Sequence, residues 1–279
     1  MAVFTAIPFW LQLLADVYLA FGVASALYIT YDILLRGHRM EMKIMNIVWP
    51  ITAFYFGPVG LWAFWHIGHV NLLKIGKEAQ EEKGHHHMEE GHHMEGASHK
   101  KGNYQEDTRS RDVSTRHLIA PHDISKGKKP FWETVFVSDT HCGAGCTIGD
   151  VVSEWIVYLG GTAILIAGSL LLTEYIFDFI LAYALGIYFQ FNPIKQMQSN
   201  LSTREALSRA IKADTISLVS FEVGLFGWMA LMRFVFFSQP LLPNEPLFWF
   251  MMQIGMILGF WSSHLPNWWL VKKGIKMGM

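Results

Sequence analysis

Two cysteines and a histidine lie close together near the middle of the chain, in the sequence SDTHCGAGCTIGD (138–150). His141, Cys142 and Cys146 bring one imidazole and two thiols together, and such groups bind soft or borderline metals such as copper and zinc. The glycines of this motif predict a tight loop, which would turn both sulfurs toward one point at the start of the next helix. Two other interpretations are open: a redox pair of thiols, and a glycine-rich packing turn with inert cysteines.

The polar stretch 76–130 is rich in histidine, and its centre reads KGHHHMEEGHHMEGASHKK. Imidazole suits zinc and copper, and the interspersed methionines supply thioether sulfur, which suits Cu(I). Few hydrophobic residues are available to form a core, so the stretch is predicted to be a disordered loop in the absence of a ligand. A solvated low-complexity linker is the alternative. The candidate metal ligands of this loop are His85, His86, His87, His92 and His93.

Ionisable side chains inside apolar segments form a second set of candidates, because such groups are costly in lipid unless they are paired or hydrated. Asp150 and Glu154 are four residues apart, a spacing that places them on one face of a helix just below the cysteine motif. A pair of imidazoles, His66 and His69, has helical spacing near the end of the second apolar segment, and is a further candidate metal site. The other residues of a predicted ion or proton path are Asp214, Glu222 and His264.

The elements that must position these groups are transmembrane helices. Hydrophobic residues make up 52% of the 279 residues and charged residues only 16%, against about 25% charged in soluble domains. A formal net charge of −1 gives no basic footprint for nucleic acid, and two cysteines are too few for a disulfide framework. We therefore predict an all-α polytopic protein of the cytoplasmic membrane, with the lipid bilayer as its first partner.

A transmembrane helix needs about 20 mostly apolar residues, and about six segments qualify. They predict three parts: a two-helix membrane hairpin (1–75), the His-rich hydrophilic loop after the second helix (76–130), and a four-helix membrane domain (131–279). Ser202-x-x-Glu205 has the pattern of a capping box and predicts the start of the fifth helix. Ala182-x-x-x-Gly186 predicts close packing between helices. The predicted spans are 7–35, 46–73, 149–172, 175–190, 211–237 and 247–271.

Four motifs together resemble a known but uncharacterised family, domain of unknown function 4396, over residues 131–279. They are HCGAGCTIGD (141–150), DTISLVSFEVGLFGWM (214–229), FWFMMQIGMILG (248–259) and NWWLVKKGIK (267–276). The resemblance implies a four-helix membrane module that carries the HCGAGC element, and it implies no established activity. The positions that match the family's pattern are His141, Cys142, Cys146, Asp150, Glu222, Asn267 and Trp268.

The leading hypothesis is a membrane protein that transports or hands on a transition metal, copper or zinc. The loop would collect ions, the Cys–His motif would coordinate them, and the buried acids would carry the cation or a counter-moving proton. The chain lacks a GxxxxGK[ST] motif, so transport would be driven by a gradient.

Two other roles remain open. One is a redox component or accessory subunit of a larger membrane complex, holding metal, haem or quinone, with His66, His69 and His264 as possible axial ligands. The other is a structural subunit whose polar groups are paired internally. A homo-oligomer would be compatible with each role, and an enzymatic activity is not predicted.

Overall fold

The structure is a computed structural model that describes residues 4, 6–40, 42–69 and 130–278. The His-rich loop lies outside these ranges. The described parts on either side of it belong to one compact unit and are mostly helical, and they contain no β-strand. The helical elements are α1 (Phe9–Leu34), α2 (Met45–Phe56), α3 (Pro58–Ala63), the π-helical turn η1 (Phe64–His69), α5 (Phe131–Gly160), the 3₁₀ turn η2 (Gly161–Ile164), α6 (Leu170–Met197), α7 (Thr203–Leu231), the π-helical turn η3 (Met232–Phe236) and α8 (Pro246–Lys272).

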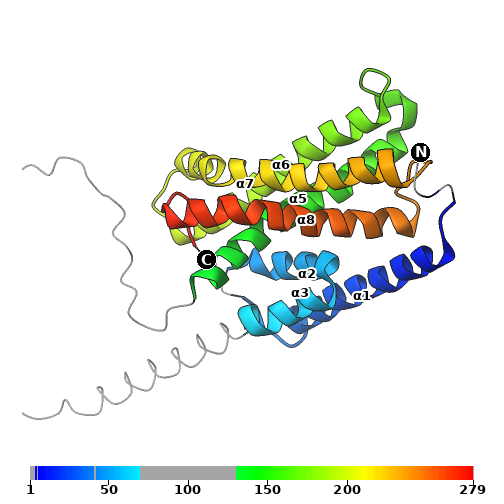
Figure 1. Cartoon of the computed structure of the whole chain (residues 1–279). Coiled ribbons are helices and arrows are strands. Elements are labelled where there is room, and N and C mark those ends of the chain that lie inside the picture. The colour runs from blue at the N-terminus through cyan, green and yellow to red at the C-terminus, as the bar shows by residue number, and fades with distance from the viewer. Residues whose placement is uncertain (1–3, 5, 41, 70–129, 279) are drawn as a thin grey trace, which may run out of the picture. The chain divides into compact units, whose positions relative to one another are not determined.

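Helices α5 to α8 pack into a four-helix bundle, in which α5 contacts α6 and α8, and α7 contacts the same two helices (Figure 1). Helices α1 and α2 pack on each other and against α8, and α2 also contacts α5. The N-terminal hairpin and the bundle thus share one interior. The start of α7 confirms the predicted capping box, since the Ser202 side chain accepts a hydrogen bond from the Glu205 backbone and Glu205 bonds back to Ser202.

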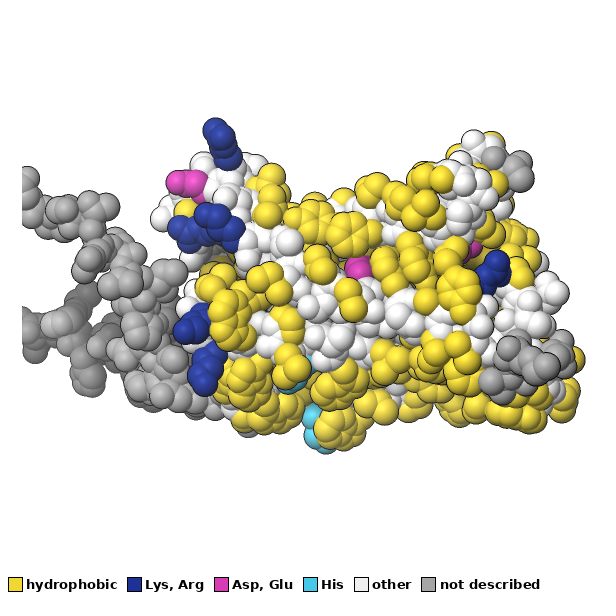
Figure 2. Space-filling view, turned by 45° about the horizontal axis from the view of Figure 1, so that its top comes forward, with side chains coloured by type: hydrophobic (Ala, Val, Ile, Leu, Met, Phe, Trp, Pro, Cys, Tyr) yellow, Lys and Arg dark blue, Asp and Glu magenta, His cyan; other side chains and the backbone are white. Residues whose placement is uncertain are grey.

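Three elements are long and apolar enough to cross a membrane: α1, α6, and α7 with its continuation to Phe236. Their most apolar windows have mean hydropathies of 1.7, 1.7 and 1.6, and most of each window faces outward. On α1, for example, Phe9 is 78% exposed and Leu27 is 63% exposed. In Figure 2, hydrophobic side chains cover the middle of the visible face, while most of the Lys and Arg side chains gather at one end. An apolar surface of this extent fits a membrane protein.

The prediction of a tight loop at the cysteine motif is wrong. Helix α5 runs without interruption through residues 138–150, and it begins 18 residues before the predicted span at 149. The glycines allow α5 to pack closely against α6 and do not form a turn. A Cβ atom on Gly145 would lie 2.6 Å from the Cα of Gly186, and a Cβ atom on Gly149 would overlap the backbone of Ala182. Contact with α6 therefore stabilises a helix that local propensity disfavours.

The boundary between α5 and α6 also differs from the prediction, which placed it near Thr173–Glu174. The chain turns at 161–169, where Gly161 has a φ of 52° and Gly168 a φ of 70°. These left-handed conformations favour glycine. The predicted second span is interrupted as well: α2 ends at Phe56, Gly57 has a φ of 57°, and Pro58 begins α3.

Replacing Gly149 by Ala is expected to destabilise the bundle by about 1–3 kcal/mol, because the added methyl group forces α5 away from α6. The matched control is Gly227→Ala on α7, where a Cβ atom meets nothing within 4 Å. Thermal unfolding of both variants in detergent would check this. Equal midpoints for the two variants would contradict the close approach at Gly149.

Candidate functional site

Helix α5 places four ionisable or thiol side chains along a stripe that turns gradually around the helix, by about 40° from each residue to the next. Cys142, Cys146, Asp150 and Glu154 follow one another at intervals of four residues, and each is at least 96% buried. At 1.5 Å per residue, the line extends about 18 Å along the helix axis. That is more than half of the roughly 30 Å hydrocarbon core. A continuous polar line therefore passes through the interior of the bundle.

The two thiols form the first part of this line. Cys142 and Cys146 are both fully buried, free of disulfide bonds and close enough to interact with each other. The carboxyl group of Glu222, on α7, lies beside Cys146. Met252 and Met256 of α8 belong to the same buried cluster as the cysteines. Soft sulfur atoms thus adjoin an acidic group in one enclosed region.

Carboxyl groups from three helices converge on the next part of the line. Asp150 has Glu222 of α7, Asp178 of α6 and its own neighbour Glu154 as electrostatic neighbours. Within the described ranges, neither oxygen of Asp150 or of Glu222 has a hydrogen-bond partner. None of these four acids forms an ion pair with another described residue. Buried acids without a counter-charge are costly as anions, so this cluster is suited to hold protons or to receive a cation.

His141 does not join the thiols in a three-ligand site. Five residues separate it from Cys146, so the two side chains point about 140° apart around the helix. The structure leaves both ring nitrogens of His141 buried and without a partner among the described residues. Those residues also contain no group of three or more His, Cys, Asp or Glu side chains placed to hold a metal ion. The continuous helix separates ligands that a loop would have brought together.

At the other end of the line, near the end of α8, the acidic groups have partners. Lys276 follows α8 and is 1% exposed, and its ammonium group forms an ion pair with Asp214 of α7. It also donates a hydrogen bond to Oδ1 of Asn267 at 2.7 Å. Burial lowers the pKa of Lys276, but Asp214 and other acidic neighbours outweigh this, so the pKa lies above the ordinary value. Lys276 is therefore charged at neutral pH.

The second partnered acid is Asp139 of α5, whose Oδ2 lies 2.6 Å from Nδ1 of His264 on α8. The imidazole of His264 also contacts the rings of Trp261 and Trp268. A carboxylate at Nδ1 fixes the ring and leaves Nε2 as the available nitrogen, an arrangement that is common for histidines that bind metals.

The remaining candidates lie away from the bundle line or outside the described residues. His66 is exposed on η1, and its Nδ1 lies 2.9 Å from the carbonyl oxygen of Trp62. The side chain of His69 and the loop ligands are not among the described residues. Predicted roles for them as metal or haem ligands stay predictions. The ligands concerned in the loop are His85, His86, His87, His92 and His93.

Sequence reasoning missed one polar group that the fold brings to the thiols. Tyr55 of α2 is fully buried, and its hydroxyl group would lie 3.0 Å from a Cβ atom on Gly143. It has Cys142 and Cys146 as electrostatic neighbours. Nothing in the local sequence around Tyr55 signals this position, because it arises from the packing of α2 against α5.

Comparison with known proteins identifies the bundle but gives no activity. No curated protein and no solved structure matches the chain. The family described as Domain of unknown function (DUF4396) matches residues 131–276. That match covers α5 to α8 and all the residues of the polar line, and it confirms the resemblance carried by the four sequence motifs. The chain therefore belongs to the DUF4396 family.

Proposed function

We propose that this protein spans the cytoplasmic membrane six times and moves a transition-metal cation, copper or zinc, through the α5–α8 bundle. The six spans would be α1, α2 with α3, and the four helices of the bundle. Helices α5 and α8 contain 30 and 27 residues, which at 1.5 Å per residue is enough to cross a core of about 30 Å. Their polar side chains face the interior, where other helices shield them from lipid.

The observation that supports this function is the position of the thiol pair within a line of buried carboxyl groups that form no ion pair with a described residue. Thiolates select soft cations, and adjacent carboxylates lower the cost of a positive charge in an apolar interior. Cys142 and Cys146 offer two sulfur ligands, whereas a structural zinc site takes four ligands. Copper as Cu(I) therefore suits the pair better than zinc does.

The proposed function also assigns roles to the other candidate groups. The His-rich loop would collect ions, and His264, held by Asp139, would offer Nε2 as a ligand near the end of α8. Asp150 and Glu222 would accept the cation from the thiols or carry a proton in the opposite direction. The paired acid Asp214 would close the path at the end near Lys276.

Substituting both cysteines by serine is expected to lower bound copper at least tenfold, because a hydroxyl group is a poor ligand for Cu(I). The experiment uses full-length protein in which all eight histidines of 76–130 are Gln and both of its methionines are Leu, so that these side chains do not contribute to the metal count. The positions are His85, His86, His87, His92, His93, His99, His117 and His122, with Met88 and Met94. Purified protein is loaded with Cu(I) or Zn²⁺, freed of excess metal and measured by mass spectrometry.

Thr140→Val is the matched control, since Thr140 is another buried polar residue of α5 and its hydroxyl group donates to the Val137 carbonyl oxygen. Circular dichroism of each variant tests that the helices are retained. The proposal is supported if the parent and Thr140→Val bind about one copper ion per chain and Cys142→Ser/Cys146→Ser does not. Equal metal content in the thiol variant, or an unloaded parent protein, refutes it.

A further inference from the structure

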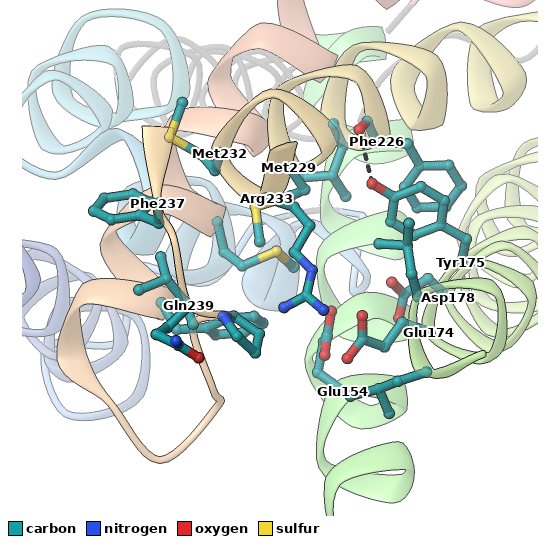
Figure 3. Close-up of a pocket in the computed structure, with 17 residues that line it drawn as sticks. Glu154, Glu174, Tyr175, Asp178, Phe226, Met229, Met232, Arg233, Phe237 and Gln239 are labelled. Atoms are coloured by element: carbon teal, nitrogen blue, oxygen red, sulfur yellow. Dashed lines mark hydrogen bonds between the residues drawn. The ribbon is translucent and has the colours of Figure 1, made fainter. Parts of the chain in front are cut away.

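A small cavity lies at the end of the polar line opposite Lys276. It has a volume of about 50 Å³ and is lined by α5, the start of α6, the end of α7, η3 with the connection that follows it, and α8. Glu154, Glu174 and Asp178 supply three carboxyl groups to its wall, and Arg233 of η3 supplies a guanidinium group. Figure 3 shows the Arg233 side chain extending toward Glu154 and Glu174.

Oxygen atoms without hydrogen-bond partners among the described residues, on two of these acids, indicate that the cavity holds a polar ligand. Oε2 of Glu154 and Oδ1 of Asp178 are buried and have no hydrogen-bond partner in the part of the chain that the structure describes. Both residues are at least 96% buried, and both line the cavity. A water molecule needs only about 10–15 Å³ of such space, so the cavity can hold a few waters. It is too small for an organic substrate.

Two acids of the cavity wall also belong to the row of acids in the bundle. Glu154 and Asp178 are electrostatic neighbours of each other and of Asp150, and Asp150 adjoins Glu222 beside the thiols. The groups that face the cavity from the helices around it are Glu154 of α5, Glu174, Tyr175 and Asp178 of α6, and Arg233 of η3. The Tyr175 hydroxyl donates a hydrogen bond to the Phe226 carbonyl oxygen at 3.0 Å, so its proton is engaged elsewhere.

We propose that this cavity is a proton port and that Arg233 is its electrostatic gate. A hydronium ion in the cavity gives a proton to the carboxylate of Glu174 or Asp178 and leaves as water. The resulting carboxylic acid passes a proton to the carboxylate of Glu154, the cavity acid on α5, and is itself restored as an anion. No electron moves. In the proposed function, this port would supply the counter-moving proton. The inference rests on the proposed function only for the identity of the ion that moves against the proton.

Arg233 suits a gating role because of its charge and its position. Its guanidinium group interacts electrostatically with the carboxyl group of Glu174. A fixed positive charge on the cavity wall repels hydronium, and it stabilises the carboxylate form of a neighbouring acid. Arg233 lies in a π-helical turn, an element that often marks functional positions in helices. Removing this charge should admit protons more easily.

Proteoliposomes that enclose a pH-sensitive dye test the port. A potassium gradient with valinomycin imposes a membrane potential, and proton entry is followed in chelator and again with Cu(I). Asp178→Asn and Glu174→Gln are expected to slow proton entry at least tenfold, and Arg233→Gln is expected to speed it at least threefold. Arg204→Gln, at an exposed position on α7, is the control for loss of a positive charge.

The outcomes separate the port from the proposed metal function. Proton entry that depends on Asp178 and Arg233 but has the same rate in chelator and with Cu(I) would sustain the port and refute its coupling to a metal ion. Bound copper together with unchanged proton entry in Asp178→Asn would refute the port alone. If proton entry in Arg233→Gln is no faster than in the parent, Arg233 is not a gate. Infrared spectra give a second measurement: acidification should increase the band of protonated carboxylic acids more in the parent than in Asp178→Asn, and an equal increase in both overturns the port.

Discussion

Asp150→Asn is expected to reduce cation movement through the bundle at least tenfold while leaving the protein as stable as the parent or more stable. The amide has nearly the same shape as the carboxyl group but neither binds a cation strongly nor exchanges a proton. Asp150 is fully buried with no partner for either oxygen among the described residues. Because a buried acid without a partner opposes folding, its neutralisation should not weaken the fold.

The measurement pairs copper uptake into proteoliposomes, followed with a metal-sensitive dye, with thermal unfolding of the same preparations. Asp16→Asn is the matched control, because it makes the same chemical change on α1 at an exposed position. A structural role for Asp150 would lower the unfolding temperature together with the flux. Uptake in Asp150→Asn equal to that of the parent would show that the cation does not pass this residue.

Lys276→Met is expected to cost about 3–5 kcal/mol of stability, because it leaves the buried carboxylate of Asp214 without its counter-charge. Lys276 and Asp214 are both at most 1% exposed, so water cannot replace the lost partner. The combined variant Lys276→Met/Asp214→Asn should recover most of the loss, since neither charge then remains. Lys273→Met, at an exposed position three residues earlier, is the control.

Chemical denaturation of the four proteins in detergent would measure this coupling. A combined variant that is no more stable than Lys276→Met alone would show that the pair is not the source of the effect. The pH dependence has a definite sign. Because the folded pKa of Lys276 lies above its ordinary value, the pair contributes fully at neutral pH. Its contribution is lost only as pH rises through that folded pKa, in strongly alkaline solution.

The two ends of the polar line therefore differ in their electrostatics. At the end near Lys276, each of two acids has a basic partner: Lys276 for Asp214, and His264 for Asp139. At the cavity end, carboxyl groups outnumber the one guanidinium group that faces them. If the proposed function is correct, a cation within the line would be stabilised most strongly between the thiols and the cavity, where acids without counter-charges are concentrated.

Much of the local structure could be predicted from the sequence. The low charged fraction and long apolar segments indicated a helical membrane protein, and the capping box at Ser202 and Glu205 located the start of α7. The spacing of Asp150 and Glu154 placed both on one helix face, as the structure has them. These features depend on solvation and on contacts within a few residues, so the local sequence contains the information that determines them.

Only the tertiary structure decided how the cysteine motif is used. Its glycines disfavour a helix locally, yet their lack of side chains lets α6 approach α5 and makes the helix favourable in the bundle. The continuous helix aligns Cys142 with Cys146 and directs His141 elsewhere. The partners of the line come from far along the chain: Asp178 from α6, Glu222 from α7, and Lys276, 62 residues from Asp214. Which side chains meet depends on which helix faces pack together, and that is a property of the whole bundle.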